Sequence, residues 1–274
     1  MYSPSMRVVD RNGRPYKFQI VSGRKADPRK MAEVYNSVLG PLESGMAVTT
    51  EQMAARLQRD IRSVLAGFLD GKLCALINVV RRAGMQVPDT HQKLTYEDWF
   101  TCVLENGAES WFCPWVAVDK GYRQIGAVVN EKILSLGQLL VRAVKNDAFQ
   151  DPYIKQLFAY TRPAYIRKFL GRSGTLTESL DPDTGKTKYY LNGNLLELSS
   201  WGIRLAGSGE NILSMQQYWN EKDPDNEKNK YDHVLGFHAK LGGIFMEDLV
   251  KPDGNPEDGL AMHYRTPVMH LKKE

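Results

Sequence analysis

The middle of the chain constrains the fold most, because two strand-like segments flank a stretch with helical periodicity. Residues 111–118, WFCPWVAV, are rich in aromatic and β-branched residues and predict a strand, and residues 156–161, QLFAYT, predict another. A long helix is expected from Gly126, since apolar residues recur at helical spacing on one face: Val129, Ile133, Leu136, Leu140 and Val144. This spacing predicts a βαβ unit with two parallel neighbouring strands. Pro114 requires an edge position or a bulge in the first strand.

Shorter elements are expected on both sides of this unit. Before the βαβ unit, the sequence predicts a strand at 16–22, a helix after Asp27–Pro28 and a second helix after the capping box of Thr49 and Gln52. Two strands follow, at 64–69 and 73–80, and the hairpin turn Asp70–Gly71 joins them. Residues 85–108 read as irregular, with a short helix at TYEDWF. After the βαβ unit, the sequence predicts a hairpin at DPDTGKTKYYLNGN, a helical turn at SMQQYW and a solvated linker at NEKDPDNEKNK. A helix from Asp232 to Leu241 and strands at 244–250 and 259–265 are expected to follow. We interpret residues 172–231 as an insertion over one end of the sheet.

The composition indicates an ordinary globular protein of 274 residues. No apolar run approaches the roughly 20 residues that span a bilayer, and the first residues lack the apolar core of a signal peptide. The three cysteines form no C-x-x-C pair, which favours reduced thiols. The net charge of +4 is spread along the chain, without the dense basic blocks of a nucleic-acid-binding arm. We expect a cytoplasmic protein that binds neither nucleic acid nor membrane, and a homodimer is compatible with the sequence.

The loop DKGYRQIGA, residues 119–127, has the residue types of an anion site. It is expected between a strand and a helix, where backbone N–H groups and the positive end of the helix dipole are available. Gly121 and Gly126 allow the backbone to approach a ligand closely, and Arg123 can form paired hydrogen bonds with a phosphate. The sequence therefore favours a diphosphate ligand, although glycines and an arginine also occur in loops that bind nothing.

Other motifs are weaker. The loop does not have the spacing G-x-G-x-x-G, which disfavours a nicotinamide dinucleotide, and GKT at 185–187 lacks the first glycine of a phosphate loop. The five histidines do not fall into a metal-binding pattern, so no metal site is predicted.

Two segments resemble the GNAT superfamily of N-acyltransferases. Residues 118–129, VDKGYRQIGAVV, are similar to the coenzyme A loop of that superfamily, and residues 237–243, FHAKLGG, are similar to its F-Y-x-K-x-G-F segment. The order of expected elements also matches over most of the chain, as do details of a longer, poorly characterised subgroup. The resemblance implies one α/β (α+β) domain over residues 1–274, with a mixed, mostly antiparallel sheet and a splayed central pair of parallel strands flanked by helices. Asp119–Lys120, Val128 and His238 depart from the usual pattern.

The resemblance also implies the residues that bind coenzyme A. In the superfamily the fourth and fifth strands splay at a bulge, and the pantetheine arm pairs with exposed main chain of the fourth strand. Pro114 fits such an interrupted ladder. The residues implied for pantetheine are Trp115, Val116, Ala117 and Val118, and those implied for the diphosphate are Arg123, Gln124, Ile125, Gly126, Ala127 and Val128. Val128 replaces a small residue and could crowd the diphosphate.

Four further residues are candidates for the chemistry. His238 stands where many family members carry a tyrosine that acts as general acid, and it would otherwise cap a helix C-terminus. Glu109 is the carboxylate nearest the expected base position, or a solvated loop residue. Cys113 could accept an acyl group or be a packed core thiol, and Arg162 could meet a substrate carboxylate or be a surface charge.

These residues lead to one functional hypothesis and one alternative. The hypothesis is an N-acyltransferase that uses acetyl-CoA or another acyl-CoA as co-substrate, needs no metal, and acylates a small-molecule amine or amino acid. The alternative is a degenerate member that binds acyl-CoA or a protein partner without turnover.

Overall fold

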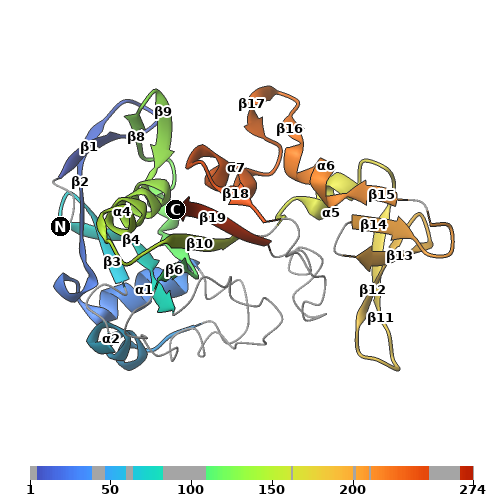
Figure 1. Cartoon of the computed structure of the whole chain (residues 1–274), viewed down its shortest axis with the longest axis horizontal. Helices are drawn as coiled ribbons and strands as arrows, with labels where there is room; N and C mark the ends of the chain where they lie inside the picture. The colour runs from blue at the N-terminus through green and yellow to red at the C-terminus, as the bar shows by residue number, and fades with distance from the viewer. Residues whose placement is uncertain are drawn as a thin grey trace. The chain divides into compact units, whose positions relative to one another are not determined.

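The computed structural model describes residues 5–38, 47–59, 64–82, 109–161, 163–199, 202–209, 211–246 and 266–273 (Figure 1). The chain divides into two compact units. Unit 1 comprises Met1–Gln86, Leu94–Ala159 and His270–Glu274, and unit 2 comprises Val87–Lys93 and Tyr160–Met269. The single domain expected from the sequence stays a prediction, because compactness alone does not tell whether the two units fold separately.

Unit 1 is built on a seven-stranded antiparallel sheet with the strand order β7-β4-β3-β2-β1-β8-β9. Its strands are β1 (Met6–Val9), β2 (Pro15–Ser22), β3 (Val64–Leu69), β4 (Lys72–Asn78), β7 (Val116–Val118), β8 (Gly126–Val129) and β9 (Lys132–Ser135). The predicted hairpin turn between β3 and β4 is confirmed: Asp70 and Gly71 both have positive φ, 47° and 81°, as a type I′ turn requires.

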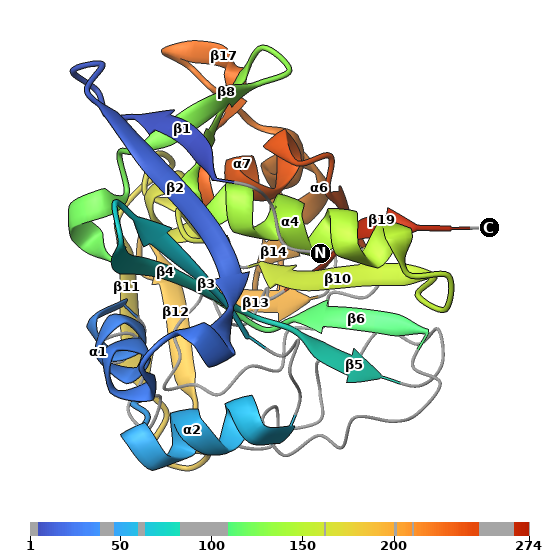
Figure 2. The same cartoon turned by 90° about the vertical axis from the view of Figure 1, so that its left-hand side faces the viewer.

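Three helices of the described residues cover this sheet. They are α1 (Pro28–Val38), α2 (Thr50–Arg59) and α4 (Leu136–Gln150), and a short 3-10 turn, Gly23–Lys25, precedes α1. The predicted capping box of α2 is present: Thr49 N donates to Gln52 Oε1 at 2.8 Å, and Gln52 N donates to Thr49 Oγ1 at 3.2 Å. Helices α1 and α2 pack on one face through a buried cluster that includes Tyr35, Leu76 and Trp115. Helix α4 contacts β3, β4 and β7 and lies on the opposite face (Figures 1 and 2).

A second sheet has the order β18-β19-β10-β6-β5 and contains the predicted parallel pair. Its strands are β5 (Val80–Arg82), β6 (Ser110–Cys113), β10 (Gln156–Thr161), β18 (Ile244–Phe245) and β19 (Thr266–Lys272). Strands β6 and β10 run parallel, with Ser110 opposite Gln156 and Cys113 opposite Ala159. The expected fold class, a mostly antiparallel α/β protein with a parallel strand pair, is therefore confirmed.

Unit 2 contains a five-stranded antiparallel meander, β11 to β15 in sequence order. Its strands are β11 (Leu176–Leu180), β12 (Thr187–Leu191), β13 (Asn194–Ser199), β14 (Gly202–Leu205) and β15 (Asn211–Ser214), and a hairpin of β16 (Lys222–Asp223) and β17 (Asn226–Lys230) follows. The helices described in this unit are α5 (Ile166–Leu170), α6 (Met215–Asn220) and α7 (His233–Lys240). Their apolar sides form one buried cluster with the meander, including Tyr189, Trp219 and Leu235.

Some expectations about the elements were wrong. Residues 126–135 form the hairpin β8–β9, and the helix predicted from Gly126 begins at Leu136. The segment NEKDPDNEKNK is not a linker, because most of it forms the hairpin β16–β17. The irregular region at 85–108 and the strand at 259–265 lie outside the described residues, as does most of the strand expected at 244–250. Among the described helices, none has the length and apolar character that crossing a membrane requires.

Candidate functional site

The strand predicted at residues 111–118 is divided between the two sheets. Its first half, β6, pairs with β10 up to Cys113, and its second half, β7, pairs with β4. The break falls at Pro114 and Trp115, where the proline has no N–H to donate. Strand β7 is an edge strand of its sheet in the part of the chain that the structure describes. The splay that the sequence predicted between the parallel strands is therefore present.

The hydrogen bonds around β7 determine which main-chain groups face outward. Asn78 N donates to Trp115 O at 3.2 Å, and Asp119 N donates to Cys74 O at 2.9 Å. In an antiparallel ladder the hydrogen-bonded pairs alternate, so Ala117 is the residue of β7 that bonds to β4. The N–H and C=O groups of Val116 and Val118 consequently point away from β4. Arg123 Nε donates to the outward Val118 carbonyl at 3.3 Å.

Buried side chains hold this edge in place. The Trp115 ring is buried and meets the Tyr35 ring of α1 edge to face, with centroids 4.8 Å apart. Ala117 is fully buried in the same cluster as residues of α1 and α2, and α1 and α4 both contact β7. The main chain of β7 is thus presented by a rigid core, which suits a ligand recognised through backbone hydrogen bonds.

The loop after β7 folds onto its own backbone. Asp119 caps a 3-10 turn, Lys120–Tyr122, and its carboxylate accepts from Gly121 N at 2.9 Å. Tyr122 N donates to Asp119 O at 2.9 Å, and Ile125 N donates to Tyr122 O at 3.2 Å. Of the amides that were expected to face the diphosphate, that of Ile125 is used within the loop.

The expected helix start at Gly126 was the physical basis for a diphosphate site at residues 123–128, and it was wrong. The side chains of Val128 and Ile133 are both 69% exposed and lie opposite each other in the hairpin. Asn130 and Glu131 form its turn with positive φ, 47° and 64°. Helix α4 instead begins at a complete capping box of Ser135 and Gln138. This S-x-x-Q signal was visible in the sequence and was missed. The diphosphate role of Arg123, Gln124, Ile125, Gly126, Ala127 and Val128 stays a prediction that rests on the resemblance alone.

Two of the predicted chemical groups lie beside the parallel strands. Glu109 immediately precedes β6 and accepts from Lys155 Nζ at 2.7 Å, in a partly exposed ion pair. Cys113 is buried, and burial raises the pKa of its thiol to about 12. The thiol is thus protonated at neutral pH, as in a packed core cysteine, and a thiolate nucleophile is disfavoured.

The other predicted groups belong to unit 2. His238 is buried on α7, next to the ring of Phe237, and its carbonyl accepts from Leu241 N and Gly243 N at the end of the helix. The helix begins at Asp232, as predicted, and Asp232 also accepts from the Tyr218 hydroxyl at 2.6 Å. Arg162 lies outside the described residues. The roles of His238 and Arg162 stay predictions.

Thr161 is a candidate that the sequence did not single out. It ends β10, two residues beyond the last residue that pairs with β6. Its hydroxyl is buried and has no hydrogen-bond partner among the described residues. Such a group is available to a ligand, but burial of this kind carries no signal in a single sequence.

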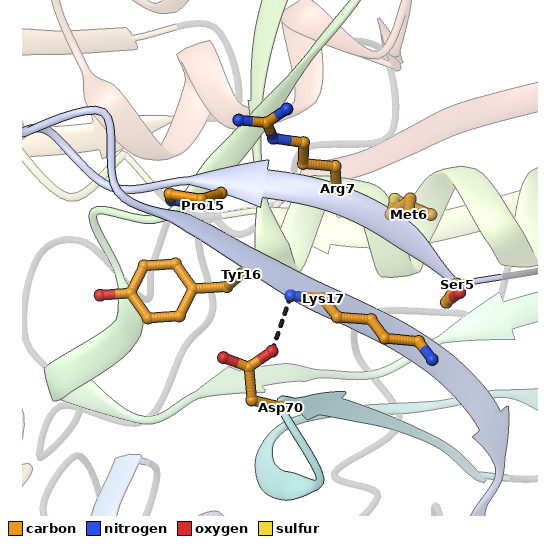
Figure 3. Close-up of a pocket in the computed structure, with 7 residues that line it drawn as sticks. All are labelled: Ser5, Met6, Arg7, Pro15, Tyr16, Lys17 and Asp70. Carbon is orange, nitrogen blue, oxygen red and sulfur yellow. Dashed lines mark hydrogen bonds between the residues drawn. The ribbon is translucent and has the colours of Figure 1, made fainter.

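A separate hollow of about 360 Å³ lies over β1 and β2 (Figure 3). Arg7 and Lys17 stand directly opposite each other across the two strands, and Lys17 N donates to Asp70 Oδ1 at 2.8 Å. None of the predicted site residues lines it. Elsewhere in the described residues, no group of three His, Cys, Asp or Glu side chains could hold a metal ion.

Comparison with solved structures identifies the fold. The loading GNATL domain of CurA from Lyngbya majuscula is 14% identical to this chain, with a TM-score of 0.58 over 93% of this chain and 97% of that one. The GphF GNAT-like decarboxylase in complex with isobutyryl-CoA is also 14% identical, with a TM-score of 0.56 over 92% and 98%. No protein-family model and no curated protein sequence matches the chain. The predicted GNAT resemblance is thus confirmed at the level of the fold.

Proposed function

We propose that this chain, which has the GNAT fold, binds an acyl-CoA thioester along β7 and acts on its acyl group. The observation that supports this most is the division of one strand into β6 and β7. It leaves the N–H and C=O groups of Val116 and the N–H of Val118 directed outward at a sheet edge. The pantetheine arm carries two amides that can pair with such an edge as an added strand does.

One candidate reaction is transfer of the acyl group to a small-molecule amine, as the sequence predicted. The amine nitrogen attacks the thioester carbonyl, the C–N bond forms, the C–S bond breaks, and the thiolate takes up a proton. The amine must also lose a proton to a base. His238 is the predicted acid and Glu109 the predicted base. The ion pair of Glu109 with Lys155 weakens the second assignment, because the carboxylate is already engaged by a cation.

A second candidate reaction is decarboxylation of a thioester that carries a carboxylate on the carbon next to its carbonyl. The C–C bond breaks, CO₂ leaves, the electron pair enters the thioester enolate, and the enolate carbon takes a proton. This route needs a proton donor such as His238 but no base, so the engaged Glu109 does not count against it. A second observation favours it: the GphF GNAT-like decarboxylase matches nearly the whole chain.

One set of assays separates these reactions. Acetyl-CoA is supplied with a panel of small amines, and malonyl-CoA is supplied alone. Release of free thiol with the amines supports transfer, whereas CO₂ release with the thioester intact supports decarboxylation. In either case His238→Ala should abolish turnover while affinity for the thioester is retained. Binding without any product would favour the degenerate alternative, and absence of binding would contradict the proposal itself.

A further inference from the structure

We infer that the acyl thioester is recognised through its pantetheine arm and not through the diphosphate of coenzyme A. The ligand class is then pantetheine thioesters in general, and the nucleotide part of coenzyme A contributes little to the affinity. This inference rests on the proposed function. It is carried by three places where a diphosphate could have found backbone donors: in two of them the donors are engaged by the chain itself, and in the third they point in opposite directions.

In the loop after β7, a carboxylate of the chain itself already accepts a backbone hydrogen bond. Asp119 accepts from Gly121 N at 2.9 Å with its side chain and from Tyr122 N with its carbonyl. Ile125 N donates to Tyr122 O. A phosphate placed at these amides would have to displace an internal negative charge, and like charges at close range repel.

The amides of β8 cannot converge on one phosphate group. In the two-residue hairpin, Val129 and Lys132 form a hydrogen-bonded pair, so the N–H groups of Ala127 and Val129 point towards β9. Those of Gly126 and Val128 point to the other side, where Gly126 lies opposite Val9 of β1. A helix N-terminus differs, because its first N–H groups all point in one direction.

The N-terminus of α4 is likewise occupied. Ser135 Oγ accepts from Gln138 N at 3.4 Å, and Gln138 Oε1 accepts from Ser135 N at 2.9 Å. Leu136, Gly137 and Gln138 are all buried. The first turn of the helix is therefore capped by the chain and covered, whereas an anion site needs it open.

A series of acetyl thioesters tests the inference directly. Equilibrium dissociation constants are measured for acetyl-pantetheine, acetyl-4′-phosphopantetheine, acetyl-dephospho-CoA and acetyl-CoA. We expect the affinities to agree within about fivefold across the series. A rise of about thirtyfold or more on adding the phosphates, the effect of a helix terminus that holds an anion, would overturn the inference. If none of the four binds, the proposed function fails, which is a different result.

A variant gives the inference a second test. Asp119→Ala removes the internal carboxylate and frees Gly121 N. We expect this variant to bind acetyl-CoA more tightly relative to acetyl-pantetheine than the unaltered protein does, because a phosphate can then occupy the vacated position. An unchanged ratio, in a variant whose affinity for acetyl-pantetheine is retained, would contradict the role assigned to Asp119.

Discussion

Gly126 and Gly121 lie in the same predicted ligand loop, yet their surroundings differ. A Cβ on Gly126 would meet the carbonyl oxygen of Leu134 in the facing strand β9. A Cβ on Gly121 would meet only Asp119 Oδ1, at 3.5 Å, which is an ordinary contact. Close packing of the hairpin thus explains Gly126 without any ligand.

Substitution of these two glycines is expected to separate packing from binding. Gly126→Ala should lower the free energy of unfolding by about 2 kcal/mol, because the methyl group overpacks the hairpin. Gly121→Ala, the matched control, should change it by less than about 0.5 kcal/mol. Denaturant unfolding measures both. Equal stability of the two variants would show that the hairpin does not constrain position 126.

His270 of β19 gives the fold a pH dependence. It is 3% exposed, and burial, with Lys145 nearby, lowers its pKa from 6.5 to about 4. The unfolded chain therefore binds a proton at higher pH than the folded chain does. The contribution of His270 to the free energy of unfolding is fully present above the pKa that this histidine has in the unfolded chain. It is lost as the pH falls through the pKa that the histidine has in the folded chain.

The predicted loss between pH 7 and pH 4 is about 3 kcal/mol from this residue. His270→Gln should flatten the dependence over that range, whatever its stability at pH 7, because glutamine does not titrate. Urea unfolding at a series of pH values provides the measurement. A variant with the same slope as the unaltered protein would contradict the assignment.

At the scale of elements, the segment between β7 and α4 shows what periodicity can and cannot predict. Val129, Ile133 and Leu136 have helical spacing, but the first two lie in strands. Their β-branched side chains and the turn at Asn130–Glu131 favour a hairpin, and the capping box at Ser135 marks the true helix start. Local signals for both structures were present, and the hairpin that formed also pairs with β1, where Gly126 lies opposite Val9.

The capping box should contribute measurably to stability. Ser135→Ala is expected to lower the free energy of unfolding by about 1 kcal/mol, because Gln138 N loses its partner at a buried helix end. Ser135→Asp, which keeps an acceptor at the cap, should retain most of that stability. Thermal unfolding of the pair is the measurement, and equal losses in both variants would mean that the cap is not the cause.

Across the whole molecule, the sequence predicted pairings between nearby segments better than those between distant ones. The parallel pair, the break at Pro114 and the caps at Thr49 and Asp232 follow from local residue chemistry, and all are present. The pairing of β1 with β8, at Val9 and Gly126, was not predicted, because strands that lie far apart in sequence carry no local signal of their pairing.

In the candidate site, too, some features could be predicted from local residue chemistry and others could not. The open main chain at Val116 and Val118 could be anticipated from Pro114 and the resemblance. The ion pair of Glu109 with Lys155 and the buried hydroxyl of Thr161 depend on contacts that only the fold creates.

The central claim is that the outward main chain of β7 binds the thioester's arm, and one titration tests it. Val118→Pro removes an N–H that β4 does not use, and Ile133→Pro removes an equivalent outward N–H from β9, at the other edge of the same sheet. Calorimetric titration with acetyl-CoA should show about tenfold weaker binding for Val118→Pro, since the ligand carbonyl loses its donor, and unchanged binding for Ile133→Pro. Equal affinities in the two variants, with both folded, would contradict the claim.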